Sequence, residues 1–293
     1  MRMLTPTILI QLILAGVLQG GTYALAAFGL SLIFCIAEVL NITHGEFLML
    51  GGLVTYILFT ATGWNPFVIL LIVIPLFIFV GLAYQKTFIK PILNRPPRQL
   101  FFSSIVVTVG IATAIEDTTS FIWGPTVKGV SYAMPAFVVG GVVISSLRLT
   151  ILLLIIALTI FLHFYLKKTF LGKAIRAILQ NREGAMVIGI NVPRVITFVF
   201  GIAIGLAAVA GVFYVLQFTI GPYIGLPLTI RYIAIVMLGG SGSLIGSLVG
   251  GLILGVAETF AGFFLGAHWS LAVAFFALVL VLLLKPEGLF KHV

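Results

Sequence analysis

Apolar residues occur in long blocks along this chain, and short polar or charged segments separate them. A helix that crosses a bilayer needs about 20 mainly apolar residues, and most of the blocks have about this length. They are continuously apolar instead of alternating over about ten residues, so they favour helices over barrel strands. The pattern predicts membrane segments near residues 8–36, 45–62, 66–84, 102–122, 148–166, 195–217, 227–239, 243–262 and 268–284.

The composition agrees with a membrane protein. Hydrophobic residues make up 61% of the 293 residues and charged residues only 8%, whereas soluble domains are about 25% charged. A soluble enzyme, a nucleic-acid-binding protein and a disulfide scaffold are therefore excluded for the whole chain. The first apolar block is too long for the apolar region of a signal peptide, so we expect it to be retained. Cys35 is the only cysteine and is expected to be a small core residue.

The net charge of +9 reflects topology more than a polyanionic ligand, because membrane proteins concentrate Lys and Arg in cytoplasmic loops. Twelve of the 16 basic residues lie in two loops and the C-terminal tail, which we therefore place in the cytoplasm: Lys86, Lys90, Arg95 and Arg98; Lys167, Lys168, Lys173, Arg176, Arg182 and Arg194; Lys285 and Lys291. Tryptophan favours membrane interfaces. With this orientation Trp64, Trp123 and Trp269 all fall at the outer ends of predicted segments.

The number of crossings is eight or nine, because two blocks are ambiguous. The run Gln19-Gly20-Gly21-Thr22 could divide the first block, and 227–239 is short for a full crossing. An even number of crossings must separate the second basic loop from the tail. The Gly-rich run at 239–243 is therefore best explained as a break between two membrane segments. We expect an all-α, polytopic helix bundle, partly discontinuous, that forms a single membrane domain over residues 1–293.

The densest polar group in the apolar regions lies between residues 38 and 46. Thr43 and Glu46 have the spacing of a capping box, which predicts a helix start here. If that start lies within the membrane, its free N–H groups and positive dipole end form a site for a carboxylate. The alternative is a surface turn with a capped helix. Candidate pathway residues are Asn41, Thr43, His44, Gly45 and Glu46, together with Gly239, Gly240 and Gly242.

Few other charges lie in the apolar blocks. Glu116 and Asp117 are adjacent, and neighbours on a helix do not face each other, so a structural or interfacial role is favoured over a paired-carboxylate site. Arg231 and Glu258 are isolated and could pair across neighbouring helices. Small residues recur every four positions in two series, Ser243, Ser247, Gly251, Gly255 and Gly242, Gly246, Gly250. Such spacing allows helices to approach closely, either within one subunit or at a subunit interface or pathway wall.

The loop at about 167–194 contains Glu183-Gly184-Ala185 followed by Gly189. This spacing resembles the Glu-Ala-Ala-x-x-x-Gly pattern of the cytoplasmic coupling loops of ABC import permeases, with Gly184 in place of an alanine. A short amphipathic helix that projects from the membrane can sit in a groove of a partner ATPase, and a glycine lets the chain turn back. Gly172 and Arg176, earlier in the same loop, complete the candidate coupling residues.

Several motifs together resemble the branched-chain amino acid ABC transporter permease family, of LivH type, over residues 15–285. They are the runs at 20–25, 41–46, 221–225, 238–243 and 250–255; departures occur at Thr43 and Gly184. The resemblance implies one of two membrane subunits, working with two cytoplasmic ATPases and an extracytoplasmic binding protein that delivers Leu, Ile, Val or similar substrates. It also implies alternating access in the cytoplasmic membrane, without chemistry on the substrate.

The chain lacks a Gly-x-x-x-x-Gly-Lys-Ser/Thr phosphate loop and is not itself the ATPase. We expect no cofactor here, with ATP and Mg bound by the partner ATPases, and no nucleic acid. Two other classes stay open: an ion-coupled secondary transporter that uses Glu38, Glu46, Glu116 or Asp117, and a non-transporting membrane scaffold. Within the family, urea or short amides are alternative substrates.

Overall fold

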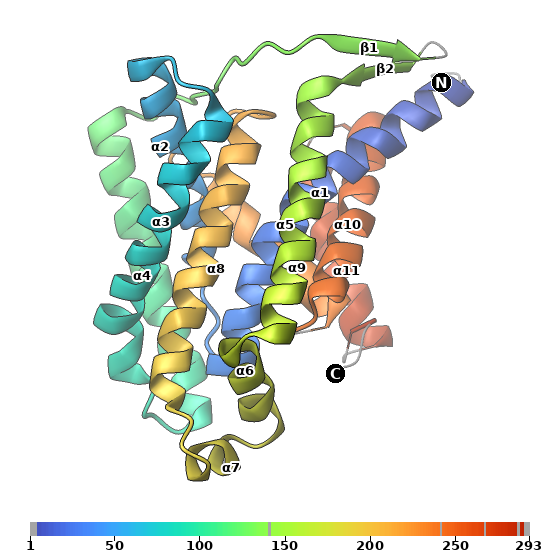
Figure 1. Ribbon diagram of the computed structural model, residues 1–293. Coiled ribbons are helices and arrows are strands. Elements are labelled where there is room, and N and C mark those ends of the chain that lie inside the picture. The colour runs from blue at the N-terminus through green and yellow to red at the C-terminus, as the bar shows by residue number, and fades with distance from the viewer. Residues whose placement is uncertain (1–4, 140–141, 241, 267, 286–287, 290–293) are drawn as a thin grey trace.

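The computed structural model describes residues 5–139, 142–240, 242–266, 268–285 and 288–289. Most of these residues are helical, and one short β-hairpin connects two of the helices (Figure 1). The elements in chain order are α1 (Pro6–Ala37), α2 (His44–Thr62), α3 (Pro66–Tyr84), the π-helix η1 (Gln85–Ile89), the 3₁₀ helix η2 (Lys90–Ile92), α4 (Pro97–Trp123), β1 (Ala136–Val139), β2 (Val142–Ser145), α5 (Ser146–Lys168), α6 (Phe170–Gln180), α7 (Arg182–Val187), α8 (Val192–Val215), α9 (Gly225–Gly239), α10 (Leu244–Phe264) and α11 (Trp269–Leu284).

Each of the nine predicted membrane segments is a helix with nearly the predicted bounds. Among the described residues, seven helical spans are long and apolar enough to cross a bilayer, and α9 and α11 are shorter apolar helices. The possible division of the first block is wrong, because α1 is continuous over 32 residues. Gly20 serves packing here: a Cβ atom at Gly20 would lie 2.5 Å from the carbonyl oxygen of Gly251 on α10.

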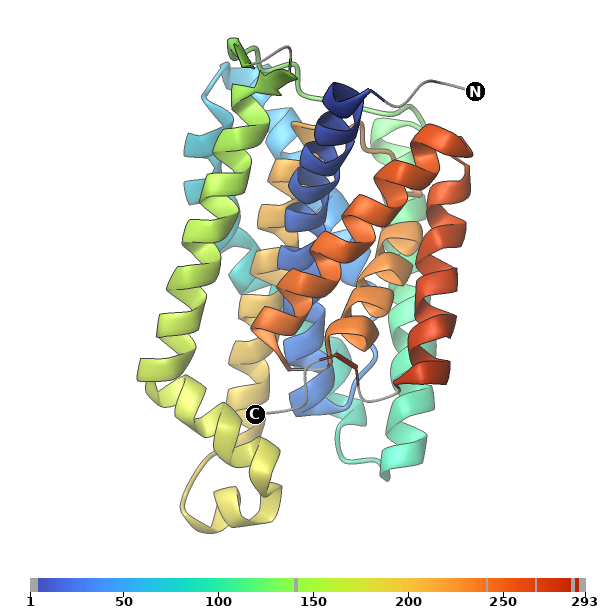
Figure 2. The ribbon, with the colours of Figure 1, turned by 90° about the vertical axis from the view of Figure 1, so that its right-hand side faces the viewer.

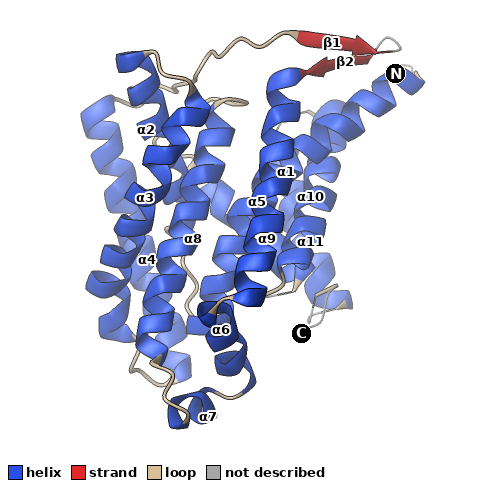
Figure 3. Ribbon diagram, in the orientation of Figure 1, coloured by secondary structure: helices blue, strands red, loops and turns tan. Residues whose placement is uncertain are grey.

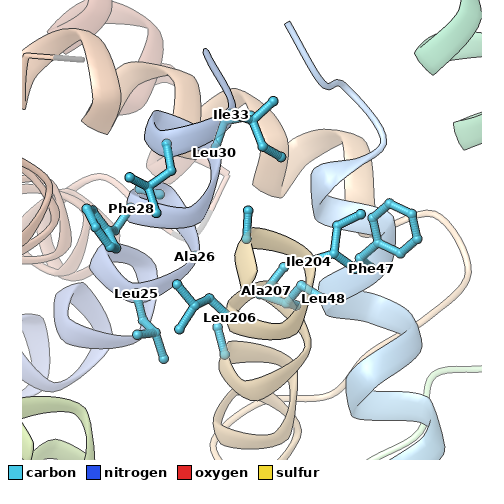
Figure 4. Packing of buried hydrophobic residues seen from close by; sticks show 14 of the residues in the cluster. Leu25, Ala26, Phe28, Leu30, Ile33, Phe47, Leu48, Ile204, Leu206 and Ala207 are labelled. Carbon is cyan, nitrogen blue, oxygen red and sulfur yellow. The ribbon is translucent and has the colours of Figure 1, made fainter. Parts of the chain in front are cut away.

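The helices α1 and α8 form the centre of the bundle. Figure 4 shows Leu30 and Ile33 of α1, Leu48 of α2, and Ile204 and Ala207 of α8 packed into one buried cluster. α1 also packs along α10, and α8 along α2 and α3. Lipid tails are as apolar as these side chains, so close van der Waals contact, more than water exclusion, stabilises such a core.

The Gly-rich run at 239–243 separates helix α9 from helix α10, as predicted. α9 ends at Gly239, and Gly240 and Gly242 both have positive φ angles, of 89° and 82°. Ser243 then caps α10, because its hydroxyl accepts a hydrogen bond from the Gly246 N–H group at 2.9 Å. Positive φ is readily adopted by glycine, which explains why the reversal uses this residue type.

The small-residue series on α10 packs within this subunit. Gly251 and Gly255 face α1, where a Cβ atom on Gly255 would lie 2.5 Å from the Gly16 carbonyl oxygen. Gly246 faces Gly239 on α9. Of the alternatives left open by the sequence, packing inside one subunit is therefore correct for these three glycines.

The hairpin of β1 and β2 was not predicted. It pairs Ala136 with Ser145 in an antiparallel register and lies at one end of the bundle (Figure 3). Its strands are only four residues long, and apolar runs this short do not separate a strand from the end of a membrane segment. The all-α assignment thus holds for the bundle but misses this connection.

α6 and α7 project from the opposite end of the bundle (Figure 2). The two basic loops lie at this end, whereas the helix ends that carry Trp64, Trp123 and Trp269 lie at the hairpin end. The basic loops and the tryptophans thus lie at opposite ends of the bundle, as predicted, and the cytoplasmic side of the basic end stays a prediction. Of the tail, Lys285 is described, and Lys291 lies outside the described residues.

Candidate functional site

Residues 39–43 run through the interior of the bundle, whereas Glu38 before them is exposed. The backbone N–H groups of Leu40 and Ile42 donate to the hydroxyls of Ser104 at 3.3 Å and Thr108 at 3.1 Å, both on α4. These hydroxyls lie 7 and 11 residues beyond the first residue of α4, Pro97. At about 1.5 Å per residue, the segment lies about 10–17 Å from that end of the helix. α2 therefore begins inside the bundle. Of the two alternatives, a helix start within the membrane is correct and a surface turn is wrong.

The predicted capping box is absent, although the helix does begin at His44. The Thr43 hydroxyl donates to the carbonyl oxygen of Thr108 at 2.7 Å, and the Tyr84 hydroxyl donates to Thr43 Oγ1 at 3.1 Å. Thr43 has helical dihedral angles, φ −64° and ψ −3°, instead of the extended geometry of a typical cap. Neighbouring helices thus compete successfully for the hydroxyl, and the cap interpretation of Thr43 and Glu46 is wrong.

Asn41 and His44 also bind other helices. Asn41 Oδ1 accepts a hydrogen bond from the Tyr84 hydroxyl at 2.9 Å, and His44 Nε2 lies 2.9 Å from the carbonyl oxygen of Ala26 on α1. The His44 ring also packs edge-on against Tyr232 on α9. Both side chains are fully buried, so in this conformation they join helices α1, α3 and α9.

Gly45 brings α2 into close contact with α9. Its N–H group donates to Thr229 Oγ1 at 2.8 Å, and the same hydroxyl donates to the Ile42 carbonyl oxygen at 2.9 Å. A Cβ atom on Gly45 would overlap the carbonyl oxygen of Gly225. The predicted close backbone approach is present, and the N-termini of two membrane helices meet there.

Glu46 lies at the same junction. Its carboxyl group packs against Gly225, the first residue of α9. The carboxyl group of Glu116 on α4 is near enough to interact electrostatically with that of Glu46. Asp117, the next residue, is exposed. The proximity of Glu46 and Glu116 was missed, because 70 positions separate them and each was evaluated only against its sequence neighbours.

Buried polar atoms without hydrogen-bond partners are concentrated in residues 41–46. Seven such side-chain atoms occur among the described residues, and four belong to this segment: Asn41 Nδ2, His44 Nδ1 and both carboxylate oxygens of Glu46. Most buried polar groups in proteins are hydrogen-bonded, so each exception points to a bound ligand, a water or a change of partner during function. Asn41 and His44 thus keep polar capacity that the described chain does not use, whereas the carboxyl group of Glu46 lies beside that of Glu116.

The pathway candidates in the second motif lie elsewhere. Gly239, Gly240 and Gly242 are at the far end of α9 from Gly225, about 22 Å away for 15 residues of helix. The Gly242 N–H group donates to Ser31 Oγ of α1 at 2.6 Å. The structure therefore does not bring the two sets of candidate pathway residues together in one pocket.

Gly242 instead shares a cavity with two of the coupling candidates. The cavity has a volume of about 290 Å³ and is lined by Gly172 and Arg176 of α6 as well as by Gly242 and Ser243. Arg176 donates to the carbonyl oxygens of Leu166 at 2.8 Å and Lys167 at 3.3 Å, at the end of α5. Arg176 thus anchors α6 to the bundle.

The remaining coupling candidates form the projecting tip. Asn181 Oδ1 accepts a hydrogen bond from the Gly184 N–H group at 2.8 Å and starts α7, in which Glu183 is exposed and Ala185 is buried. Gly189 reverses the chain with φ 86°. Three apolar side chains that the sequence analysis did not consider, Met186, Val187 and Ile188, are exposed at this tip.

Comparison with known proteins relates the whole chain to transport permeases. Residues 12–284 match the family model described as "Branched-chain amino acid transport system / permease component". The high-affinity branched-chain amino acid transport system permease protein LivH of Escherichia coli (strain K12) is 31% identical over 301 residues, which cover 96% of this chain and 94% of that protein. The corresponding protein BraD of Pseudomonas aeruginosa is 30% identical, with 96% and 95% covered.

A solved structure supports the fold. PsaBC from Streptococcus pneumoniae in complex with Fab superimposes with a TM-score of 0.50 at 11% sequence identity, covering 93% of this chain and 91% of that chain. The apolar helices and the family match together establish a multi-pass membrane protein. The chain therefore belongs to the family of branched-chain amino acid transport system permease components.

Proposed function

We propose that this chain is the membrane-spanning permease subunit of an ABC importer that moves branched-chain or related small amino acids across the cytoplasmic membrane. The observation that carries the proposal is the family match over residues 12–284, together with relatives named for branched-chain amino acid transport. Separate ATPase subunits bind ATP and Mg and power the cycle. The chain itself has no catalytic role and no cofactor, and the substrate crosses without covalent chemistry.

The translocation route passes residues 41–46 and the turn at 239–242. Two observations support this route. α2 begins within residues 41–46 and α9 ends at Gly239, and the N-termini of the two helices meet inside the bundle. Broken helices of this kind place the positive end of a helix dipole at membrane depth, where it attracts a carboxylate without a buried cation. The first N–H groups of α2 are themselves bonded, to the carbonyl oxygens of Asn41 and Thr43 and to the Thr229 hydroxyl. Weak attraction suits a route, because a full Lys or Arg charge holds an anion too tightly for release.

The coupling loop at about 167–194 docks to an ATPase subunit. α6 and α7 project from the basic end of the bundle (Figure 1), and the apolar side chains of Met186, Val187 and Ile188 are exposed there. An exposed apolar tip beside basic residues fits a groove on a partner protein. Gly172 and Arg176 hold the loop on α5, so a movement of the loop is transmitted to the cavity that Gly242 lines.

The complete transporter contains a second permease subunit, two cytoplasmic ATPase subunits and an extracytoplasmic substrate-binding protein. The chain forms one domain in the cytoplasmic membrane, with the basic loops and the C-terminus on the cytoplasmic side, which follows from the positive-inside rule. No nucleic acid takes part.

Purification with native partners followed by reconstitution tests this function. We expect ATPase subunits to co-purify, and leucine uptake into proteoliposomes to need ATP and the binding protein. Uptake driven by a proton or sodium gradient alone would instead identify a secondary transporter. A competition panel of amino acids, urea, short amides and ribose defines the substrate class: strong inhibition by ribose with none by leucine would overturn the assignment.

A further inference from the structure

A second cavity at the basic end of the bundle is lined by positively charged side chains. It lies between the connection from α3 to α4, helix α7 and the start of α8, and its volume is about 400 Å³. The polar part of its wall consists of Lys86, Lys90, Asn94 and Arg182, and the apolar part of Pro91, Leu93, Pro193 and Ile196. The cavity therefore combines three cations with apolar surface.

None of these three cations has a partner for its charge in the part of the chain that the structure describes. The only ion pair among those residues joins α9 to α10, and the side chains of Lys86, Lys90 and Arg182 form no hydrogen bond there. Glu183, which follows Arg182, is exposed and does not pair with it. Like charges around one cavity repel one another, so an anion placed between them is attracted by all three.

The cavity lies at the level of the membrane surface. Helix α3 has 19 residues, which rise about 28 Å and so match a hydrocarbon thickness of about 30 Å. Trp64, a residue type that favours the interface, lies two residues before the first residue of α3, and Lys86 lies two residues beyond its last. Lys86 is therefore at the depth where lipid headgroups begin.

An exposed apolar stripe on α3 leads to this cavity. Ile72, Leu76, Phe79 and Ala83 are all exposed, and their spacing of three or four residues places them on one face of the helix. Lys86 continues the series three residues after Ala83. A cation at headgroup level, followed by an apolar stripe that runs into the membrane, matches the two parts of a phospholipid, which are a charged phosphate and acyl chains.

We propose that this cavity binds the phosphate group of an anionic phospholipid, whose acyl chains lie along the stripe on α3. The charge of the cavity selects the lipid: a zwitterionic headgroup carries a cation that the three basic side chains repel, whereas the headgroup of phosphatidylglycerol does not. Lys86 and Lys90 belong to the connection between α3 and α4, and Arg182 belongs to α7. The bound phosphate thus links α7 to the end of α3.

Lipid binding to the purified full-length chain, with any subunits that co-purify, tests the site. Native mass spectrometry counts the retained molecules at increasing concentrations of phosphatidylglycerol and, in parallel, of phosphatidylcholine. The wild type retains phosphatidylglycerol more tightly, and Lys86→Gln and Arg182→Gln each weaken this binding by about fivefold. Lys86→Arg keeps the charge and retains the lipid. Arg98→Gln is the matched control, because Arg98 is exposed in the same loop but does not line the cavity, and it leaves binding unchanged.

Thermal unfolding gives a second measurement. Phosphatidylglycerol raises the unfolding temperature of the wild type, because a ligand that binds only the folded state stabilises it. It raises that of Lys86→Gln less, while the two proteins unfold at the same temperature without the lipid.

Four results would overturn the proposal. Equal retention of phosphatidylcholine, or an equal loss in Arg98→Gln, would show that the basic end attracts lipid without a specific site. Displacement of the lipid by soluble glycerol 3-phosphate at the same concentration would indicate a site for free phosphate. Loss of co-purifying subunits from Lys86→Gln, in detergent without added lipid, would identify an acidic surface of a partner protein as the occupant.

Discussion

The guanidinium Nε of Arg231 donates a hydrogen bond to Glu258 Oε1 at 2.7 Å and joins α9 to α10. The isolation of these two charges in apolar helices made the pairing one possibility that the sequence alone did not decide, and the structure shows that it forms. The second carboxylate oxygen of Glu258 accepts hydrogen bonds from Tyr23 and Gln19 of α1, both at 3.2 Å. One buried carboxylate thus ties together three helices, including the short α9 whose N-terminus meets Glu46.

Removal of one partner of this ion pair should destabilise the protein strongly. Glu258→Ala leaves the Arg231 charge without its partner and is expected to cost about 3–5 kcal/mol, as for other buried pairs. Tyr23→Phe removes one hydrogen bond and should cost about 1 kcal/mol. Thermal unfolding in detergent measures both. If Glu258→Ala is no worse than Tyr23→Phe, the ion pair does not hold α9 in place.

Replacement of Gly255 by valine should prevent the close packing of α1 on α10. The added Cβ atom would lie 2.5 Å from the Gly16 carbonyl oxygen, so the helices must separate. Gly110→Val is the matched control, because nothing lies within 4 Å of its Cβ position. We expect a lower yield of folded protein and a lower unfolding temperature for Gly255→Val only. Equal behaviour of the two variants would contradict this helix contact.

The role of Thr43 is now expected to be interhelical. Thr43→Ala removes the hydrogen bonds with Thr108 and Tyr84 and should cost about 1–2 kcal/mol, whereas Thr43→Ser keeps the hydroxyl and should be milder. A double-mutant cycle with Tyr84→Phe, followed by thermal unfolding, isolates the contact. Additive effects would show that the two hydroxyls are not coupled.

The tip of the coupling loop should bind the ATPase through Val187. Its side chain is 87% exposed, so Val187→Asp should leave the unfolding temperature unchanged and weaken retention of ATPase subunits by about tenfold or more. Val138→Asp, at the hairpin end and 69% exposed, should retain the ATPase. Normal retention by Val187→Asp would place the docking surface elsewhere.

A bulky side chain at Gly184 tests whether the internal packing of the same loop is needed for coupling. The Gly184 N–H group bonds to Asn181 at the start of α7, and a Cβ atom there would already lie 3.3 Å from Asn181. Gly184→Trp should therefore abolish transport-linked ATP hydrolysis while the permease stays folded in the membrane. Stimulated hydrolysis that survives with normal coupling would rule this loop out as the docking element.

The sequence by itself determined the order and nearly all the bounds of the membrane helices. These depend on block length and continuous apolarity, which are local properties set by the thickness of the bilayer. It also determined the break at 239–243, because glycine adopts the positive φ angles of that turn.

Only the tertiary structure decided which polar groups meet. Thr43 bonds Thr108 instead of its own helix, and Glu46 lies beside Gly225 and Glu116. A spacing pattern describes what a residue can do within its own helix, but neighbouring helices offer competing donors and acceptors. Inside a bundle that excludes water, each polar group bonds whatever the packing brings within reach, and that packing follows from contacts between residues far apart in the chain.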